Sequence, residues 1–259
     1  MTRKVSGLVT LKYFEFYVLS DNLIVLPQIK NRKDIIIMQS KVKRNLLTGV
    51  MLFIAFVVWT ILVKTIDVKP LGVNGTDIGF ATINTWLHSL TGTNMILYNI
   101  TDWLGLVPVF VCMLFGCVGF IQLIKRKSLL RVDFDIIILG AYYVIVILCY
   151  LIFEMIPINY RPILINGVME CSYPSSTTLL VLGVMPTLIF QAKIRVKNTA
   201  IKNIIIAITV IFTVFMVVGR LLSGVHWVTD IVGSVFLSAG MYMIYKSIIE
   251  IKAGEEDGI

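Results

Sequence analysis

The sequence predicts an all-α protein that crosses a membrane six times. Of its 259 residues, 58% are hydrophobic and only 15% are charged, and the mean hydropathy of +0.90 is far above that of soluble proteins. A bilayer core about 30 Å thick requires roughly 20 mostly apolar residues per helix, and six runs of about this size lie between clusters of charged residues. The predicted spans are Leu46–Val63, Trp103–Ile124, Ile136–Phe153, Thr178–Gln191, Asn203–Val218 and Val228–Tyr245.

The distribution of lysine and arginine predicts the orientation of these spans. Short loops rich in these residues stay in the cytoplasm, and here they precede the first span, join the second to the third and join the fourth to the fifth. The loops of the opposite face hold only Lys69, Arg161 and Arg220. We therefore expect a multi-pass protein of the cell membrane with both termini in the cytoplasm. The net charge of +8 then faces anionic lipid headgroups, and the absence of a nucleic-acid-binding motif argues against a nucleic-acid partner.

The chain divides into three parts in this interpretation. Residues 1–37 form an N-terminal extension of unassigned structure, which lacks the apolar core and cleavage site of a signal peptide. Residues 38–250 form the membrane domain, and residues 251–259 form a cytoplasmic tail. Because Met38 stands just before the first span, we hypothesise that translation starts there.

The first outer loop is long enough to contain a helix of its own. Apolar residues recur in it at helical spacing, which predicts an amphipathic helix at the membrane interface. These residues are Phe80, Ile83, Trp86, Leu87 and Leu90. His88 lies on the same stretch and is expected to be a surface histidine without chemistry.

Two outer loops gather the residue types that bind and attack phosphate. Arg161 and Arg220 are basic residues on the face where basic residues are unfavoured, so an anion is their natural partner. The alternative is that both arginines extend to lipid headgroups. Asp230 follows His226 by four residues, and a carboxylate that accepts the proton of one imidazole nitrogen leaves the other free to attack. Alternatively, Asp230 caps the last helix.

The start of the fourth span carries Ser175, Ser176 and Thr177. Such residues commonly cap helices, and the backbone N–H groups of a helix N-terminus also bind phosphate. Both roles are compatible, so we expect these three residues to contribute to an anion site.

These residues resemble the motifs of the type 2 phosphatidic acid phosphatase (PAP2) and vanadium haloperoxidase superfamily, which are Lys-x6-Arg-Pro, Pro-Ser-Gly-His and Ser-Arg-x5-His-x3-Asp. Arg220, His226 and Asp230 meet the spacing of the third motif. Arg161-Pro162 matches the end of the first motif, and Pro174-Ser175 matches the start of the second.

The resemblance covers residues 46–247 and implies a PAP2-like bundle of six helices with its site on the extracytoplasmic face. It implies that His226 is the nucleophile, that Asp230 orients it and that Arg161 and Arg220 hold the phosphoryl oxygens. No metal or cofactor is expected in this scheme.

The chain departs from the motifs at four positions. Glu154 stands where the first motif has lysine, Ser176 replaces glycine, and Gly219 replaces the serine of the third motif. Thr177 replaces the histidine that protonates the leaving group in the family, and threonine is a poor proton donor near neutral pH. Glu154 is therefore a candidate for the missing acid or for an ion-pair partner of an arginine, and Glu170 is a second candidate.

Together these features predict a membrane lipid-phosphate phosphatase that works through a phosphohistidine on His226. Because a phosphate monoester leaves a diphosphate without protonation more easily than an alkoxide leaves a monoester, the expected substrate is an isoprenyl diphosphate such as undecaprenyl diphosphate. The alternative is a catalytically impaired PAP2-like protein that binds or transports lipid phosphates. The expected partners are this lipid substrate and membrane lipids. Nothing in the sequence indicates an oligomeric state, and no CxxC pair predicts a structural metal.

Overall fold

The computed structural model describes residues 32–256, and it describes side chains over residues 39–252. Six helical segments of the described chain are long and apolar enough to cross a membrane, which confirms the prediction of six spans. The spanning elements are α1 (Arg32–Thr65), α3 (Met95–Leu104) continuing into α4 (Leu106–Arg126), α5 (Phe134–Met155), α6 (Ser176–Arg195), α7 (Thr199–Leu222) and α8 (Val228–Glu256). Three shorter elements are η1 (Val73–Gly75), α2 (Ala81–Thr91) and η2 (Leu129–Arg131).

The limits predicted for the membrane domain fall inside helices. Helix α1 begins at Arg32 and runs unbroken through Met38, and α8 continues past residue 250 to Glu256. Residues 1–31 and 257–259 lie outside the described residues. The predicted N-terminal extension falls mostly there, so translation from Met38 stays a hypothesis.

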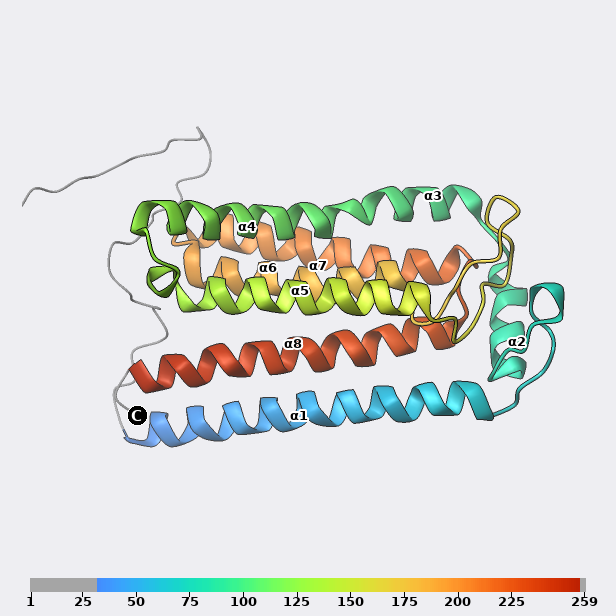
Figure 1. The fold of residues 1–259 in the computed structure, drawn as a ribbon, viewed down its shortest axis with the longest axis horizontal. Coiled ribbons are helices and arrows are strands. Elements are labelled where there is room, and N and C mark those ends of the chain that lie inside the picture. The colour runs from blue at the N-terminus through green and yellow to red at the C-terminus, as the bar shows by residue number, and fades with distance from the viewer. Residues whose placement is uncertain (1–31, 257–259) are drawn as a thin grey trace, which may run out of the picture.

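Helices α6 and α8 form the centre of the bundle. Helix α6 packs against α4, α5, α7 and α8, while α1 lies along α8 (Figure 1). The mean hydropathies of α6 and α8 are 1.5 and 1.4, below the values of 2.5 to 2.8 for the other spans, and over half of their spanning windows are buried. Their hydroxyl and charged side chains are tolerated because neighbouring helices shield them from lipid. These two central helices carry the motif residues of the fourth and sixth spans.

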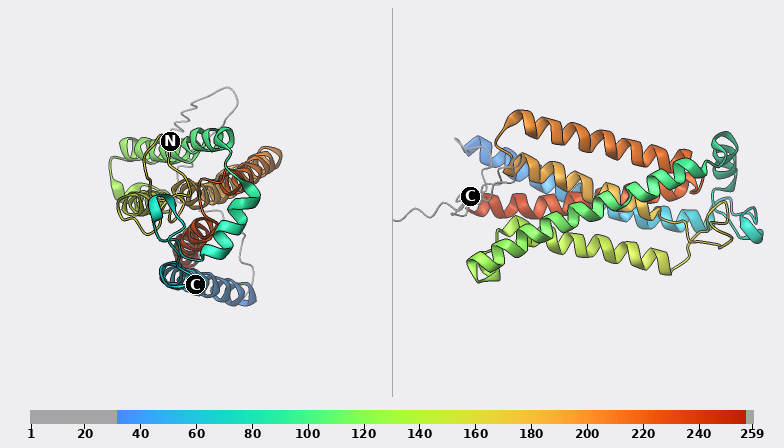
Figure 2. Two further views of the ribbon diagram at one scale, coloured as in Figure 1. Left: turned by 90° about the vertical axis from the view of Figure 1, so that its right-hand side faces the viewer. Right: turned by 90° about the horizontal axis from the view of Figure 1, so that it is seen from above.

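Helix α2 lies across the end of the bundle at which α3 begins, as the two views along and across the helices show (Figures 1 and 2). This confirms a helix in the first long loop. Asn84 faces the bundle and is buried, whereas Trp86 and Leu90 are 59% and 65% exposed. A helix with its polar contact on the protein and its large apolar residues outward suits the membrane interface.

An ion-pair network links the helices at the opposite end of the bundle. Asp133, at the start of α5, accepts hydrogen bonds from Gln122 at 2.8 Å, from Arg126 at 2.7 Å and from Arg195 at 3.2 Å. Arg195 also pairs with Asp135 at 2.6 Å, and the Asp135 side chain is only 2% exposed. The network joins α4, α5 and α6 at the end remote from α2.

We predict that Arg195→Met lowers the stability of the folded protein, because it leaves the buried Asp135 without its cation. Breaking one partner of a buried pair costs about 3 kcal/mol or more. Thermal unfolding in detergent measures the effect. The control is Lys193→Met, which removes an exposed charge from the same turn of α6 and should leave the midpoint nearly unchanged. Equal midpoints for the two variants would contradict the role of the network.

Candidate active site

His226 lies in the short connection between α7 and α8, at the end of the bundle covered by α2. Packing holds this connection closely. Gly224 has a φ of +67°, and a Cβ there would lie 1.8 Å from the Gly92 carbonyl oxygen, so only glycine fits. The Asn94 amide donates to the Ser223 carbonyl at 2.9 Å, and the half-buried His88 places its Nε2 3.1 Å from the Gly224 carbonyl oxygen. His88 is thus part of the support for this connection instead of a surface residue.

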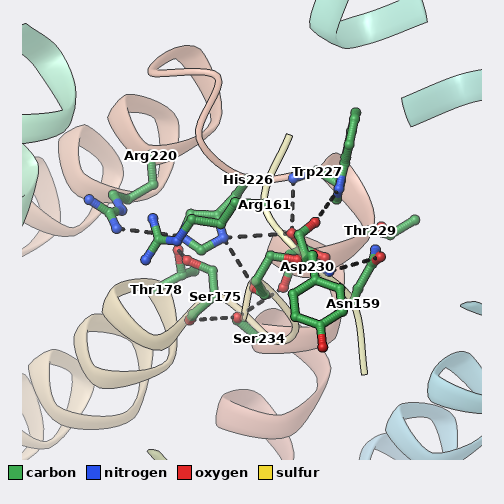
Figure 3. Close-up of polar contacts among 12 residues, drawn as sticks. Asn159, Arg161, Ser175, Thr178, Arg220, His226, Trp227, Thr229, Asp230 and Ser234 are labelled. Atoms are coloured by element: carbon green, nitrogen blue, oxygen red, sulfur yellow. Dashed lines mark hydrogen bonds and ion pairs between the residues drawn. The ribbon is translucent and has the colours of Figure 1, made fainter. Parts of the chain in front are cut away.

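The tautomer of His226 follows from its partners. Its Nδ1 lies 3.1 Å from the Ser172 carbonyl oxygen, and a carbonyl can only accept a hydrogen bond. Nδ1 therefore carries the proton, and Nε2 presents its lone pair. Nη2 of Arg220 lies 3.4 Å from Nε2 (Figure 3). The nitrogen available for attack thus faces a cation.

Asp230 holds His226 less directly than the sequence predicts. Its Oδ2 is 3.6 Å from Nδ1 of His226, farther than the Ser172 carbonyl, and it accepts the Trp227 amide at 2.9 Å. The Asp230 carbonyl accepts the Ser175 amide at 3.2 Å. Asp230 therefore fixes the backbone on both sides of the imidazole, while a backbone carbonyl sets the tautomer.

The environment of His226 keeps the imidazole neutral. The side chain is 1% exposed, and burial disfavours the charged form. Burial first, and the positive charges of Arg161 and Arg220 second, hold the pKa of His226 well below its ordinary value, although the hydrogen bond to Ser172 opposes them. A neutral imidazole is the nucleophilic form.

Arg161 and Arg220 share one aromatic platform. Their guanidinium carbons lie 5.8 Å and 5.0 Å from the centroid of the Tyr98 ring on α3, and the two residues are 5% and 1% exposed. Arg220 also places Nη1 3.4 Å from the Thr101 hydroxyl and 3.5 Å from the Asp102 carboxylate. The structure thus brings both predicted arginines to one site.

Several guanidinium donors have no hydrogen-bond acceptor within residues 32–256. They are Nε and Nη1 of Arg161 and Nε of Arg220. Nε of Arg161 is 3.1 Å from the Glu170 carboxylate, an ion-pair distance without hydrogen-bond geometry. Because a buried unpaired donor costs about 1–3 kcal/mol, and more if it is charged, this pattern fits a site for an anion with several oxygens.

The start of α6 faces the same region. Ser175 occupies the N-cap position, but its side chain makes no capping hydrogen bond, and its Oγ lies 3.0 Å from the Thr178 hydroxyl. The amides of Ser176, Thr177 and Thr178 find no acceptor in the described part of the chain. The helix terminus therefore keeps free N–H groups of the kind that bind phosphate.

The two predicted acidic residues occupy different places. Glu170 is the ion-pair partner of Arg161. Glu154 is exposed at the end of α5 and forms no ion pair with any described residue. Glu154 is therefore not the ion-pair partner of Arg161 or Arg220 in this structure.

Four contributors were missed from the sequence. Tyr98, Thr101 and Asp102 come from α3, which precedes the recognised motifs by about sixty residues, and Ser172 acts through its carbonyl. Gly219 explains the approach of α3, because a Cβ at that position would lie 2.8 Å from the Thr101 methyl group. The serine-to-glycine departure was thus a signal of close helix contact. Over the described residues, no three His, Cys, Asp or Glu side chains cluster to hold a metal ion.

Comparisons with known proteins concern the family pattern and the fold. Residues 138–252 match the model of the PAP2 superfamily, and this range includes the residues of α5 to α8 that form the site. The fold is similar to the crystal structure of the first transmembrane PAP2 type phosphatidylglycerolphosphate phosphatase from Bacillus subtilis. That match has a TM-score of 0.55 and 17% identity, and it covers 79% of this chain and 96% of that chain. A search of the curated proteins finds no match.

The motif residues of the site lie within the range that matches the superfamily model. The match to the superfamily model includes Arg161, Arg220, His226 and Asp230, and the fold shared with the transmembrane phosphatase supplies the six spans around them. Residues 138–252 therefore carry the pattern of the PAP2 superfamily, and the chain has a fold similar to that of a membrane-spanning PAP2-type phosphatase.

Proposed function

We propose that the protein is a membrane lipid-phosphate phosphatase that hydrolyses a lipid diphosphate, with an isoprenyl diphosphate such as undecaprenyl diphosphate as the best candidate. The observation that carries the proposal is the arrangement of His226, whose unprotonated Nε2 lies 3.4 Å from Arg220 Nη2 beside buried guanidinium donors that lack acceptors. A nucleophile and an anion site thus adjoin each other.

The reaction would begin with attack of His226 Nε2 on the terminal phosphorus. The bond from this phosphorus to the bridging oxygen breaks, and the lipid monophosphate leaves with the electron pair. Arg161 and Arg220, with the free amides of α6, hold the phosphoryl oxygens while charge develops. Ser175 and Asp230 maintain the geometry through the backbone bond between them. Water then releases phosphate from the phosphohistidine.

The preference for a diphosphate follows from Thr177. A general acid commonly contributes 10²–10⁴-fold to rate, and Thr177 cannot supply it. An alkoxide leaving a monoester needs that proton, whereas a phosphate monoester has its last ionisation near pKa ~6 and departs without one. The residues present therefore suit a diphosphate better than a monoester.

The proposed location is the cell membrane, with both termini in the cytoplasm and the site on the outer face. The described ends of α1 and α8 lie together at the end remote from the site (Figure 1). The basic loops 125–131 and 193–202 lie at that same end, and basic loops are retained in the cytoplasm.

We predict that the purified protein in detergent releases phosphate from farnesyl or undecaprenyl diphosphate about 10²-fold faster, or more, than from the matching monophosphate. His226→Ala should reduce release by at least about 10³-fold, because the nucleophile is removed. The control Lys193→Met changes an exposed residue at the end of the bundle remote from the site and should release phosphate at the wild-type rate. Binding of the diphosphate without turnover in the wild type would favour the carrier alternative, and unchanged turnover in His226→Ala would contradict the mechanism.

We also predict a pH dependence of stability from the lowered pKa of His226. The unfolded chain binds a proton to this residue below pH ~6.5, while the folded protein does not, so stability falls as the pH drops below that value. His226→Asn should flatten the decline of the thermal midpoint between pH 7 and pH 5. The measurement is made without phosphate, since a bound anion would raise the pKa of the imidazole. Parallel profiles for the two proteins would contradict a neutral buried imidazole.

A further inference from the structure

Asp102 contacts the same arginine that faces the reacting nitrogen. Arg220 contacts it through Nη1 at 3.5 Å and contacts His226 Nε2 through Nη2 at 3.4 Å. The carboxylate and the nucleophile therefore face adjacent nitrogens of one guanidinium. A phosphoryl group on Nε2 that is held by Arg220 would lie beside the Asp102 carboxylate.

Asp102 belongs to the turn of α3 that lies beside the start of α6. Gly105 ends this turn, and its amide donates to the carbonyls of Thr101 and Asp102, both at 3.0 Å. A Cβ on Gly105 would lie 3.4 Å from the Thr177 methyl group and 2.8 Å from the Asp102 carbonyl oxygen. The end of α3 thus touches the start of α6 at the position of the replaced histidine.

Gly219 permits this approach of α3, because a Cβ there would lie 2.8 Å from the Thr101 methyl group, while Gly105 lies beside Thr177. Gly219, which replaces the third-motif serine, and Thr177, which replaces the second-motif histidine, therefore both lie beside the end of α3. The same region brings a carboxylate to Arg220.

The exposure of Asp102 decides what it can do. Its side chain is 54% exposed while Arg220 is 1% exposed, so the carboxylate contacts both water and the anion site. A carboxylate oxygen in this position can accept a proton from a water molecule that enters the anion site. Glu170 is placed differently, because it contacts Nε of Arg161 and has no contact with Arg220.

We propose that Asp102 is the general base for hydrolysis of the phosphohistidine, a role that rests on the proposed function. A water oxygen attacks the phosphorus, and one proton of that water passes to the Asp102 carboxylate. The bond between phosphorus and His226 Nε2 breaks, and its electron pair returns to the nitrogen. Inorganic phosphate leaves, and Asp102 then releases the proton to solvent. The first step needs no acid with a diphosphate, but this second step gains from a base.

The test is Asp102→Asn, which keeps the size of the side chain and an oxygen for Arg220 but removes the base. With diphosphate labelled on its terminal phosphate, we expect a normal first turnover and a steady-state release slower by about 10²-fold or more. Label should accumulate on His226, measured after alkaline quenching and lost in His226→Ala. Hydroxylamine, a nucleophile that needs no base, should restore release of the label.

Two further variants, Asp77→Asn and Glu170→Gln, are measured beside the wild type to distinguish the possible outcomes. Asp77→Asn removes an exposed carboxylate outside the anion site and should behave as wild type. Three results would each overturn the role of Asp102 while leaving the phosphatase intact. The first is a wild-type rate in Asp102→Asn, and the second is an equal slowing of phosphohistidine formation and hydrolysis in that variant. The third is accumulation of label in Glu170→Gln instead. A wild-type protein that neither takes up label nor releases phosphate would contradict the proposed function itself.

Discussion

The hydrogen bond from Nδ1–H of His226 to the Ser172 carbonyl determines which imidazole nitrogen can react. It joins the loop between α5 and α6 to the connection between α7 and α8, so the fold selects the reactive tautomer by bringing these two segments together. Burial keeps the ring neutral, and Nε2 is left as a lone pair beside Arg220. The proposed chemistry depends on this placement of one proton.

The second constraint is the burial of two guanidinium groups. Removing a cation from water is costly unless it is paired, and here the compensation within the protein is incomplete. The Tyr98 ring, the Asp102 carboxylate and the Glu170 carboxylate contact the cations, yet donors of both arginines lack acceptors within the described chain. Both carboxylates are partly exposed, so an incoming phosphate can compete with them. The guanidinium donors that lack acceptors in the protein therefore favour the binding of an anion.

Much of this arrangement could be predicted from the sequence. The six spans and the grouping of Arg161, Arg220, His226 and Asp230 follow from hydropathy and from motif spacing, because spanning length and loop chemistry are properties of short segments. The central position of α6 and α8 is visible only afterwards, as the reason for their lower hydropathy.

The remaining features depend on tertiary packing. Ser172 contributes a backbone carbonyl, which no side-chain pattern reveals. Tyr98 and Asp102 reach Arg220 because α3 packs on α7 at Gly219, far from the motifs in sequence. Glu154 aligned with a motif position but forms no ion pair with either arginine, whereas Glu170 in the irregular loop pairs with Arg161. Sequence spacing locates residues along a helix, and packing decides which of them meet.

The central claim is that His226 Nε2 and the two arginines form one phosphoryl site. A structure of the purified protein with orthovanadate tests it most directly, because vanadate adopts the five-coordinate geometry of phosphoryl transfer. The account predicts vanadium bonded to Nε2 of His226, with its oxygens in hydrogen-bond contact with Arg161 and Arg220. Vanadium on Nδ1, or an anion bound away from both guanidinium groups, would contradict it.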